Sequence, residues 1–302
     1  MARRRGGGSR AILSAVKKLW IHVGLFVAAC GTTTWLNGPA FSATLMGILL
    51  CHELGHWFVG RHHGVPVSLP YFIPLPFSLG TMGAVIRMDR PIEDRNKLFD
   101  VGASGPVAGL VVAIPLLVIG LHLSEVGPSS PDDMIEGNSI LYALLKLAVF
   151  GRWLPGGGVD VQLHPMAFAG WVGLLVTMIN LLPIGQLDGG HVARAALGQR
   201  HETWSARLHV VLPLVGIAVS GTMLGLALHA GHDLGFALRY ASYGFTPWCM
   251  WFLLLAYMKR QGGEYHPPVG DALLDPARRL RAIGMLVIFV LIATPVPFRP
   301  AL

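Results

Sequence analysis

Charged residues are scarce in this chain. Asp, Glu, Lys and Arg make up 13% of its 302 residues, about half the share typical of a soluble domain. Cysteine is rarer still, and the three cysteines lie in or beside apolar runs, so neither a disulfide framework nor a zinc ribbon is expected. No internal repeat is visible in the sequence, which counts against the transporter folds that are built from repeated halves.

Apolar residues are correspondingly abundant. Hydrophobic residues account for 53% of the chain, and the mean hydropathy is +0.57. Such a composition excludes a disordered chain and an ordinary soluble globule. It predicts an all-α polytopic membrane protein, and the length allows about six or seven transmembrane helices of roughly 20–25 residues each.

The apolar windows divide the chain into spans. They are expected at about 19–37, 40–60, 98–123, 164–183, 208–230, 243–258 and 280–297. A weaker, interfacial helix is expected at about 138–150. The predicted organisation is a basic tail (1–18) followed by a single integral membrane domain (19–302), with a core at about 40–200 and C-terminal helices at about 204–302.

The basic residues predict an orientation in the membrane. The formal net charge is +7, and a seven-span arrangement places 19 of the 23 Lys and Arg residues on the side of the N-terminus. Because cytoplasmic loops carry the excess of Lys and Arg, we expect a multi-pass cell-membrane protein with a cytoplasmic N-terminus. The positive charge is then explained by the lipid bilayer, and no nucleic-acid partner is expected.

Segment 65–90 cannot form a regular helix. Prolines recur between Val65 and Phe77, and Gly80 and Gly83 then bracket the start of a short extended run. Proline removes a backbone donor and breaks helices, so we expect a loop or β-hairpin that dips toward the membrane. Irregular backbone at that depth survives only where protein or a water-filled cavity satisfies it.

The second predicted span contains the pattern H-E-x-x-H, from His52 to His56. Residues four apart share a helix face, so both histidines can bind one metal ion. Glu53 is close enough in sequence to reach a water molecule at that metal. Zinc suits imidazole ligands and needs a third protein ligand together with an open position for water. Ionisable residues inside a span are costly and mark functional sites.

Asp188 is the candidate for the third ligand. It follows the fourth span, which ends near Pro183, in a stretch predicted to be unwound before a short helix begins at about 191. Broken helices let side chains turn toward an ion in a cavity. The alternative is that Asp188 caps the next helix, and both roles can hold together. His191 is either a supporting residue beside the zinc ligands or simply a residue at the helix start.

Two other motifs compete with this interpretation. The run from Gly102 to Gly105 matches the G-x-S-G pattern of serine-type intramembrane proteases, but the pattern is short and common where membrane helices pack closely. A Glu in place of Asp as third zinc ligand is disfavoured, because the downstream glutamates lie in loops or outside the predicted spans.

Taken together, these motifs resemble the site-2 protease family of intramembrane zinc metalloproteases, peptidase family M50. That family pairs H-E-x-x-H with a later N-x-x-P-x-x-x-x-D-G, and both are complete here, at 52–56 and 180–189. The run 80–84 resembles the family's membrane-associated β-hairpin, and 102–109 resembles its Gly- and Pro-rich span. The loops after the second and third spans are too short for a PDZ or CBS domain, so a compact, prokaryotic-type member is expected.

The resemblance implies a metalloendopeptidase with one zinc ion per chain. His52, His56 and Asp188 would bind zinc, Glu53 would be the general base, and Asn180 would contact the substrate backbone or the developing oxyanion. The substrate would be a transmembrane protein cleaved in or near its membrane segment by Glu-assisted attack of a water held at zinc. Two alternatives stay open: a transporter that uses the polar cluster, and an inactive scaffold that binds helices. The oligomeric state is not predicted.

Overall fold

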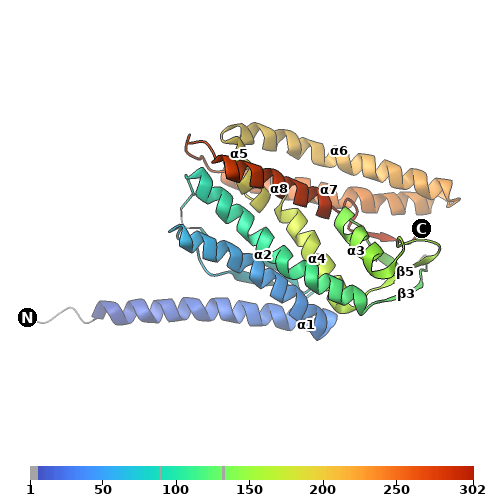
Figure 1. Cartoon of the computed structure of the whole chain (residues 1–302), viewed down its shortest axis with the longest axis horizontal. Coiled ribbons are helices and arrows are strands. Elements are labelled where there is room, and N and C mark those ends of the chain that lie inside the picture. Colours follow the sequence, from blue (N-terminus) through green and yellow to red (C-terminus); the bar gives the residue numbers. More distant parts are fainter. Residues whose placement is uncertain (1–5, 89, 131–132) are drawn as a thin grey trace, which may run out of the picture.

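The computed structural model describes residues 6–88, 90–130 and 133–302, with side chains from residue 19 onward. Most of the chain is helical, and the helices run roughly alongside one another (Figure 1). The helices are α1 (Gly6–His62), α2 (Arg95–His122), α3 (Ile140–Phe150), α4 (Pro165–Asn180), α5 (Asp188–Leu197), α6 (Arg200–His229), α7 (Leu234–Gly262) and α8 (Pro276–Ile292). The first five residues of the expected basic tail lie outside the described part.

Three helices are long and apolar enough to cross a membrane. Among the described residues these are Leu19–His62, Arg95–His122 and Arg200–His229, while α3 and α4 are shorter apolar helices. The mostly helical architecture is as expected, and these three helices are consistent with the expected membrane protein. The count of six or seven spans stays a prediction.

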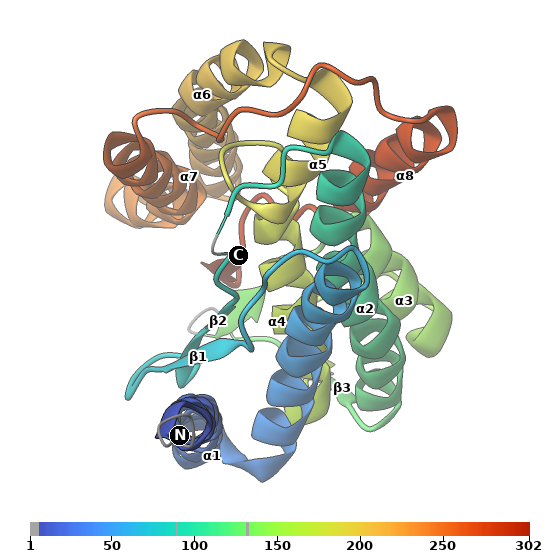
Figure 2. The same ribbon diagram turned by 90° about the vertical axis from the view of Figure 1, so that its left-hand side faces the viewer.

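The first two expected spans form one α-helix with a break. Gly38 has φ 83° and ψ 166°, which no helix contains, and Pro39 follows it inside α1. The first half of α1 lies apart from the other helices, and the second half turns back into the bundle (Figures 1 and 2). Glycine permits the positive φ, so the Gly-Pro pair turns the chain between the two halves.

A short β-hairpin lies between the first half of α1 and the bundle (Figure 2). Strand β1 (Tyr71–Pro74) pairs antiparallel with β2 (Thr81–Val85), and Phe72 lies opposite Ala84. The Thr32 hydroxyl donates a 2.6 Å hydrogen bond to the carbonyl of Gly80, which docks the hairpin on α1. The predicted hairpin is thus present.

Helix α2 packs against α1, α4 and α5 at the centre of the molecule. Glycines make these contacts possible: a Cβ on Gly55 of α1 would lie 2.6 Å from the carbonyl oxygen of Ser104 in α2, and one on Gly170 of α4 would lie 2.8 Å from the Leu117 side chain. Small residues let membrane helices approach closely and gain van der Waals contact.

Within the described residues, two further two-stranded sheets lie at the end of the bundle where the C-terminus is found (Figure 1), and they were not expected from the sequence. Strand β3 (Glu125–Pro128) pairs with β5 (Val159–Gln162), and β4 (Met134–Glu136) pairs with β6 (Phe298–Pro300). They close the end of the bundle opposite α5 (Figure 1).

The docking of the hairpin on α1 can be tested at two glycines. Gly80 and Gly83 have φ of 86° and 94°, but a Cβ on Gly80 would lie 2.5 Å from the backbone of Thr33, whereas one on Gly83 meets open space. A positive φ costs alanine about 1–2 kcal/mol. We expect Gly83→Ala to lower the free energy of unfolding by about that amount and Gly80→Ala to lower it further, measured by unfolding in detergent. Equal losses would contradict the docking.

Candidate metal centre

Three donor side chains converge inside the bundle. His52 and His56 lie one turn apart on the second half of α1, and Asp188 is the first residue of α5. The Asp188 carboxylate lies 3.1 Å from Nε2 of His52 and 3.2 Å from Nε2 of His56, and the two Nε2 atoms are 3.3 Å apart. Within the described residues, this is the group of donors that could hold a metal ion.

The donor set suits zinc. Ligands at about 2.0–2.2 Å in a tetrahedron lie about 3.3–3.6 Å from one another, close to the separations observed here. Two imidazoles and one carboxylate leave the fourth position free for water or substrate, as in catalytic zinc sites. Burial by itself would raise the pKa of Asp188, but the adjacent histidines, His56 foremost, hold that pKa below its usual range.

Helix α2 orients one of the two imidazoles and makes room for it. Nδ1 of His56 donates a 2.7 Å hydrogen bond to the carbonyl oxygen of Val101, so Nε2 is the ring nitrogen that faces the other donors and could bind a metal. A Cβ on Gly105 would overlap the His56 ring, and one on Gly109 would lie 3.2 Å from Nδ1 of His52. Both histidine side chains therefore pack against the Gly-rich part of α2.

The chain turns sharply to bring Asp188 to the histidines. Helix α4 ends at Asn180, and α5 begins at Asp188, about three residues earlier than the sequence predicted. A Cβ on Gly189 would overlap the carbonyl of Leu181, so only glycine fits directly after the aspartate. Residue 187, not Asp188, is the N-cap of α5, and the Asp188 carboxylate faces the histidines instead.

A cavity of about 600 Å³ lies in front of these donors. Glu53, which is only 6% exposed, lines it. Asn180 also lines it, and its Nδ2 lies 3.5 Å from Nε2 of His52. The other wall is the end of the hairpin, residues 84–88. All five residues predicted for the site are thus brought to one cavity.

The loop between α7 and α8 adds a residue that the sequence did not assign. His266 lines the same cavity, and its Nε2 lies 2.7 Å from Nδ1 of His191. Its Nδ1 is 2.8 Å from the carbonyl of Pro267 and must donate there, so its Nε2 accepts the hydrogen bond from the Nδ1–H of His191. Burial lowers the pKa of His266 to about 4 and that of His191 to about 3. Both rings are therefore neutral at neutral pH.

Other candidate residues make ordinary structural contacts. The Ser104 hydroxyl donates a 2.7 Å hydrogen bond to the carbonyl of Val101 within α2. His63 lies 2.9 Å from the Asp100 carboxylate, which also binds Arg278 and so joins α8 to α2. Neither contact points to serine chemistry or to a further metal ligand.

Comparison with known proteins identifies relatives. A sequence model described as peptidase family M50 matches residues 40–223. The probable zinc metalloprotease EGY1, chloroplastic, of Arabidopsis thaliana is 35% identical over 188 residues, which cover 60% of this chain and 33% of the relative. The probable zinc metalloprotease EGY2, chloroplastic, of the same plant is 27% identical over 269 residues, covering 87% of this chain and 42% of the relative. No solved structure matches the chain.

Zinc content tests the donor set directly. Protein purified in detergent should carry about one zinc per chain, and His56→Ala and Asp188→Ala should lose or greatly weaken it, because each removes a ligand. Gly105→Ala should do the same without removing a ligand, since its Cβ overlaps the His56 ring. Gly47→Ala, in α1 near the histidines, is the control, because its Cβ would meet open space. Elemental analysis that finds zinc unchanged in the Gly105 variant would contradict this geometry.

Proposed function

Because the chain belongs to peptidase family M50, we propose that it is a zinc-dependent endopeptidase that hydrolyses peptide bonds in or near the transmembrane segments of other membrane proteins. The observation that carries the proposal is the convergence of His52, His56 and Asp188 beside Glu53 in one cavity. The chain spans about a third to two-fifths of the length of the relatives named above. The proposal therefore rests on the donor cluster of this chain and not on the activity of its longer relatives.

The histidines and Asp188 would hold zinc. When bound there, zinc supplies Lewis acidity that acidifies water and polarises a peptide carbonyl. The Glu53 carboxylate is the group placed to take the proton from the attacking water and later to give it to the leaving amine. Its burial in the cavity wall excludes bulk water from that exchange.

Asn180 is proposed to bind the substrate carbonyl. Its amide nitrogen lies 3.5 Å from a metal-binding atom of His52, so a donor stands beside the position where negative charge develops. Donors aimed at a developing oxyanion lower the barrier by stabilising the transition state more than the ground state. The amide carries no charge of its own that would compete with zinc binding.

The hairpin is proposed to hold the substrate as an extended strand. A helical substrate hides its carbonyls in its own hydrogen bonds, and so it must unwind before cleavage. Strand β2 pairs with β1 on one side only within the described residues, and its end, Ala84 and Val85, lines the metal cavity. An opened segment can pair with that free edge, as in β-augmentation.

We propose the multi-pass topology that the charges favour, with six or seven spans and a cytoplasmic N-terminus in the cell membrane. The region at about 40–200 is then the catalytic core, and the helices at about 204–302 complete the single membrane domain. The zinc site lies toward the cytoplasmic side in this arrangement. Cleavage there would release a soluble fragment inward or would clear residual membrane segments.

The catalytic role of Glu53 separates a protease from its alternatives. Glu53→Gln removes the base but keeps all three zinc donors, so we expect proteolysis of a membrane substrate to fall by at least about 100-fold while zinc content stays at the wild-type level. The measurement is cleavage in detergent or liposomes, with elemental analysis on the same preparation. Unchanged cleavage would refute the assigned role, and zinc-free wild-type protein would favour a transporter or a scaffold.

The strand-edge proposal predicts an effect of proline in β2. Thr81→Pro or Ala84→Pro removes a backbone donor from the strand, so substrate cleavage should be lost while zinc stays bound. Ala84→Ser keeps the backbone N–H and should cleave normally. If a zinc-loaded proline variant cleaves as fast as the wild type, pairing of the substrate with β2 is wrong.

A further inference from the structure

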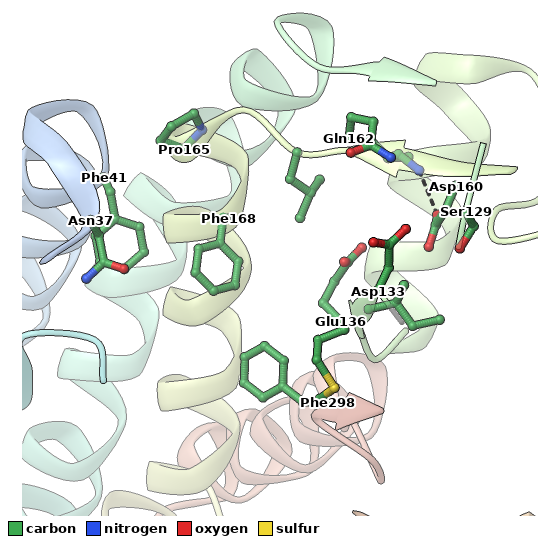
Figure 3. A pocket seen from close by; sticks show the side chains of 14 residues that line it. Asn37, Phe41, Ser129, Asp133, Glu136, Asp160, Gln162, Pro165, Phe168 and Phe298 are labelled. Atoms are coloured by element: carbon green, nitrogen blue, oxygen red, sulfur yellow. Dashed lines mark hydrogen bonds between the residues drawn. The ribbon is translucent and has the colours of Figure 1, made fainter. Parts of the chain in front are cut away.

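A second cavity lies at the end of the bundle away from the metal centre. It measures about 500 Å³ and is built from α1, α4 and the strands near the C-terminus (Figure 3). One side is aromatic, formed by Phe41, Phe168 and Phe298. The other side carries carboxylates, of which Glu136 and Asp160 are buried.

Among the described residues, the two buried carboxylates share one buried cation, Lys146. The Lys146 ammonium lies 3.4 Å from Oε1 of Glu136 and 3.6 Å from Oδ1 of Asp160. The Tyr142 hydroxyl also donates a 2.8 Å hydrogen bond to Oε1 of Glu136. One positive charge against two negative charges leaves the group anionic, and exposed Asp133 adds another carboxylate to the lining. Burial raises the pKa of Glu136, and Asp160 raises it further, whereas Lys146 and Tyr142 lower it.

One oxygen of this group has no partner. Asp160 is 3% exposed, and its Oδ1 accepts a 2.8 Å hydrogen bond from the backbone N–H of Val161. Its Oδ2 is buried and lacks any hydrogen-bond partner within the described part of the chain. Leaving a buried polar atom unpaired is costly, more so for a charged group. A buried carboxylate oxygen beside an anionic cavity therefore points to a missing cationic donor.

The shape of the cavity favours an organic cation over a metal ion. Among the described residues, close donor triplets within 4.8 Å occur at the zinc site and not among these carboxylates. A cavity of this size holds roughly two or three amino-acid side chains. Phenylalanine faces attract ammonium groups and pack against apolar carbon. A primary ammonium on an apolar peptide segment fits such a cavity, because the ammonium faces the carboxylates and the apolar carbon packs against the phenylalanines.

The hairpin connects this cavity to the zinc site. Asn37 lines the cavity, and its Nδ2 lies 3.5 Å from the carbonyl of Ser78 at the hairpin turn. From there β2 runs to Ala84, which lines the metal cavity. Phe41 and His52 are eleven residues apart on the same helix, which corresponds to about 16 Å. An extended peptide covers that distance with about five residues.

We propose that this cavity binds a primary ammonium group of the substrate, from a peptide N-terminus or a lysine side chain, and thereby sets the distance between that cation and the cleaved bond. The inference rests on the proposed proteolytic function. It selects substrates that carry an ammonium group about five or more residues from the scissile bond.

Peptide binding to the zinc-loaded Glu53→Gln protein tests the inference without cleavage. Three ten-residue apolar peptides of one sequence, fluorescently labelled at the C-terminus, are compared by anisotropy in detergent. One has a free N-terminus and no lysine, one is acetylated with a lysine at its first position, and one is acetylated without lysine. We expect at least one ammonium peptide to bind about tenfold or more tighter than the uncharged one, as for a charge-assisted hydrogen bond. The first two peptides identify the source of the ammonium.

Variants of the cavity decide whether that preference arises there. Asp160→Asn and Glu136→Gln should reduce it to less than about threefold, because each removes one negative charge. Glu125→Gln removes the same charge from exposed β3 outside the cavity and should leave the preference intact. If the buried variants do not fold, Gln162→Lys decides: Gln162 is exposed and lines the cavity, so its new ammonium should occupy the site and abolish the preference.

Failure of this inference and failure of the proposed function give different results. Equal binding of all three peptides, or a preference that persists in the Gln162→Lys protein, overturns the ammonium site even if the wild type cleaves substrates. Wild-type protein that binds no zinc and cleaves nothing overturns the proposed function, while the anisotropy preference, then measured on the zinc-free protein, still reports on the cavity. In an active wild type, mapped cleavage sites closer than about five residues to the only ammonium group would refute the distance rule.

Discussion

The close approach of α2 to the second half of α1 is the constraint on which the rest of the structure depends. At Gly105 the backbone of α2 comes so near to His56 that no side chain fits between them, and the Val101 carbonyl fixes the orientation of the imidazole. The close approach requires glycine at position 105 of this apolar helix, where it also weakens helix propensity. The reduced helix propensity is offset because the α2 backbone holds the histidines in a fixed position for metal binding.

The polar residues of the site are tolerated in an apolar bundle because each one has a partner. His52 and His56 meet Asp188, and the carboxylate is brought in by a turn that only Gly189 permits. An unpaired charge inside an apolar helix bundle is costly. The contacts of Asp188 with His52 and His56 reduce this cost even before a metal binds. The same rule makes the opposite cavity informative, since there the charges of Glu136 and Asp160 are incompletely balanced by Lys146.

Helical spacing predicted the pair of histidines, a predicted helix break pointed to Asp188, and the family resemblance implied Asn180. Contacts between residues distant in the chain account for what was missed. The spacing of His52 and His56 fixes a shared helix face, and the long apolar helices follow from composition. The hairpin was expected because prolines and glycines exclude a helix there. His266, by contrast, meets His191 from 75 residues away, and no spacing rule connects them. The pairs of three- and four-residue strands near the C-terminus are equally long-range, and their register depends on tertiary packing rather than on alternation.

The hairpin connects the two cavities of the molecule. Its turn lies beside Asn37 at one cavity, and Ala84 lies at the other, so one extended element touches both. An unwound segment paired with β2 would lose its helical hydrogen bonds and regain them from the strand edge, which makes unwinding inside the membrane feasible. A cation held at the far cavity would fix the register of that strand, because a shift of one residue would move the anchor away from Asp160. In the proposed mechanism, recognition of the distant cation and unwinding at the zinc site would both depend on β2.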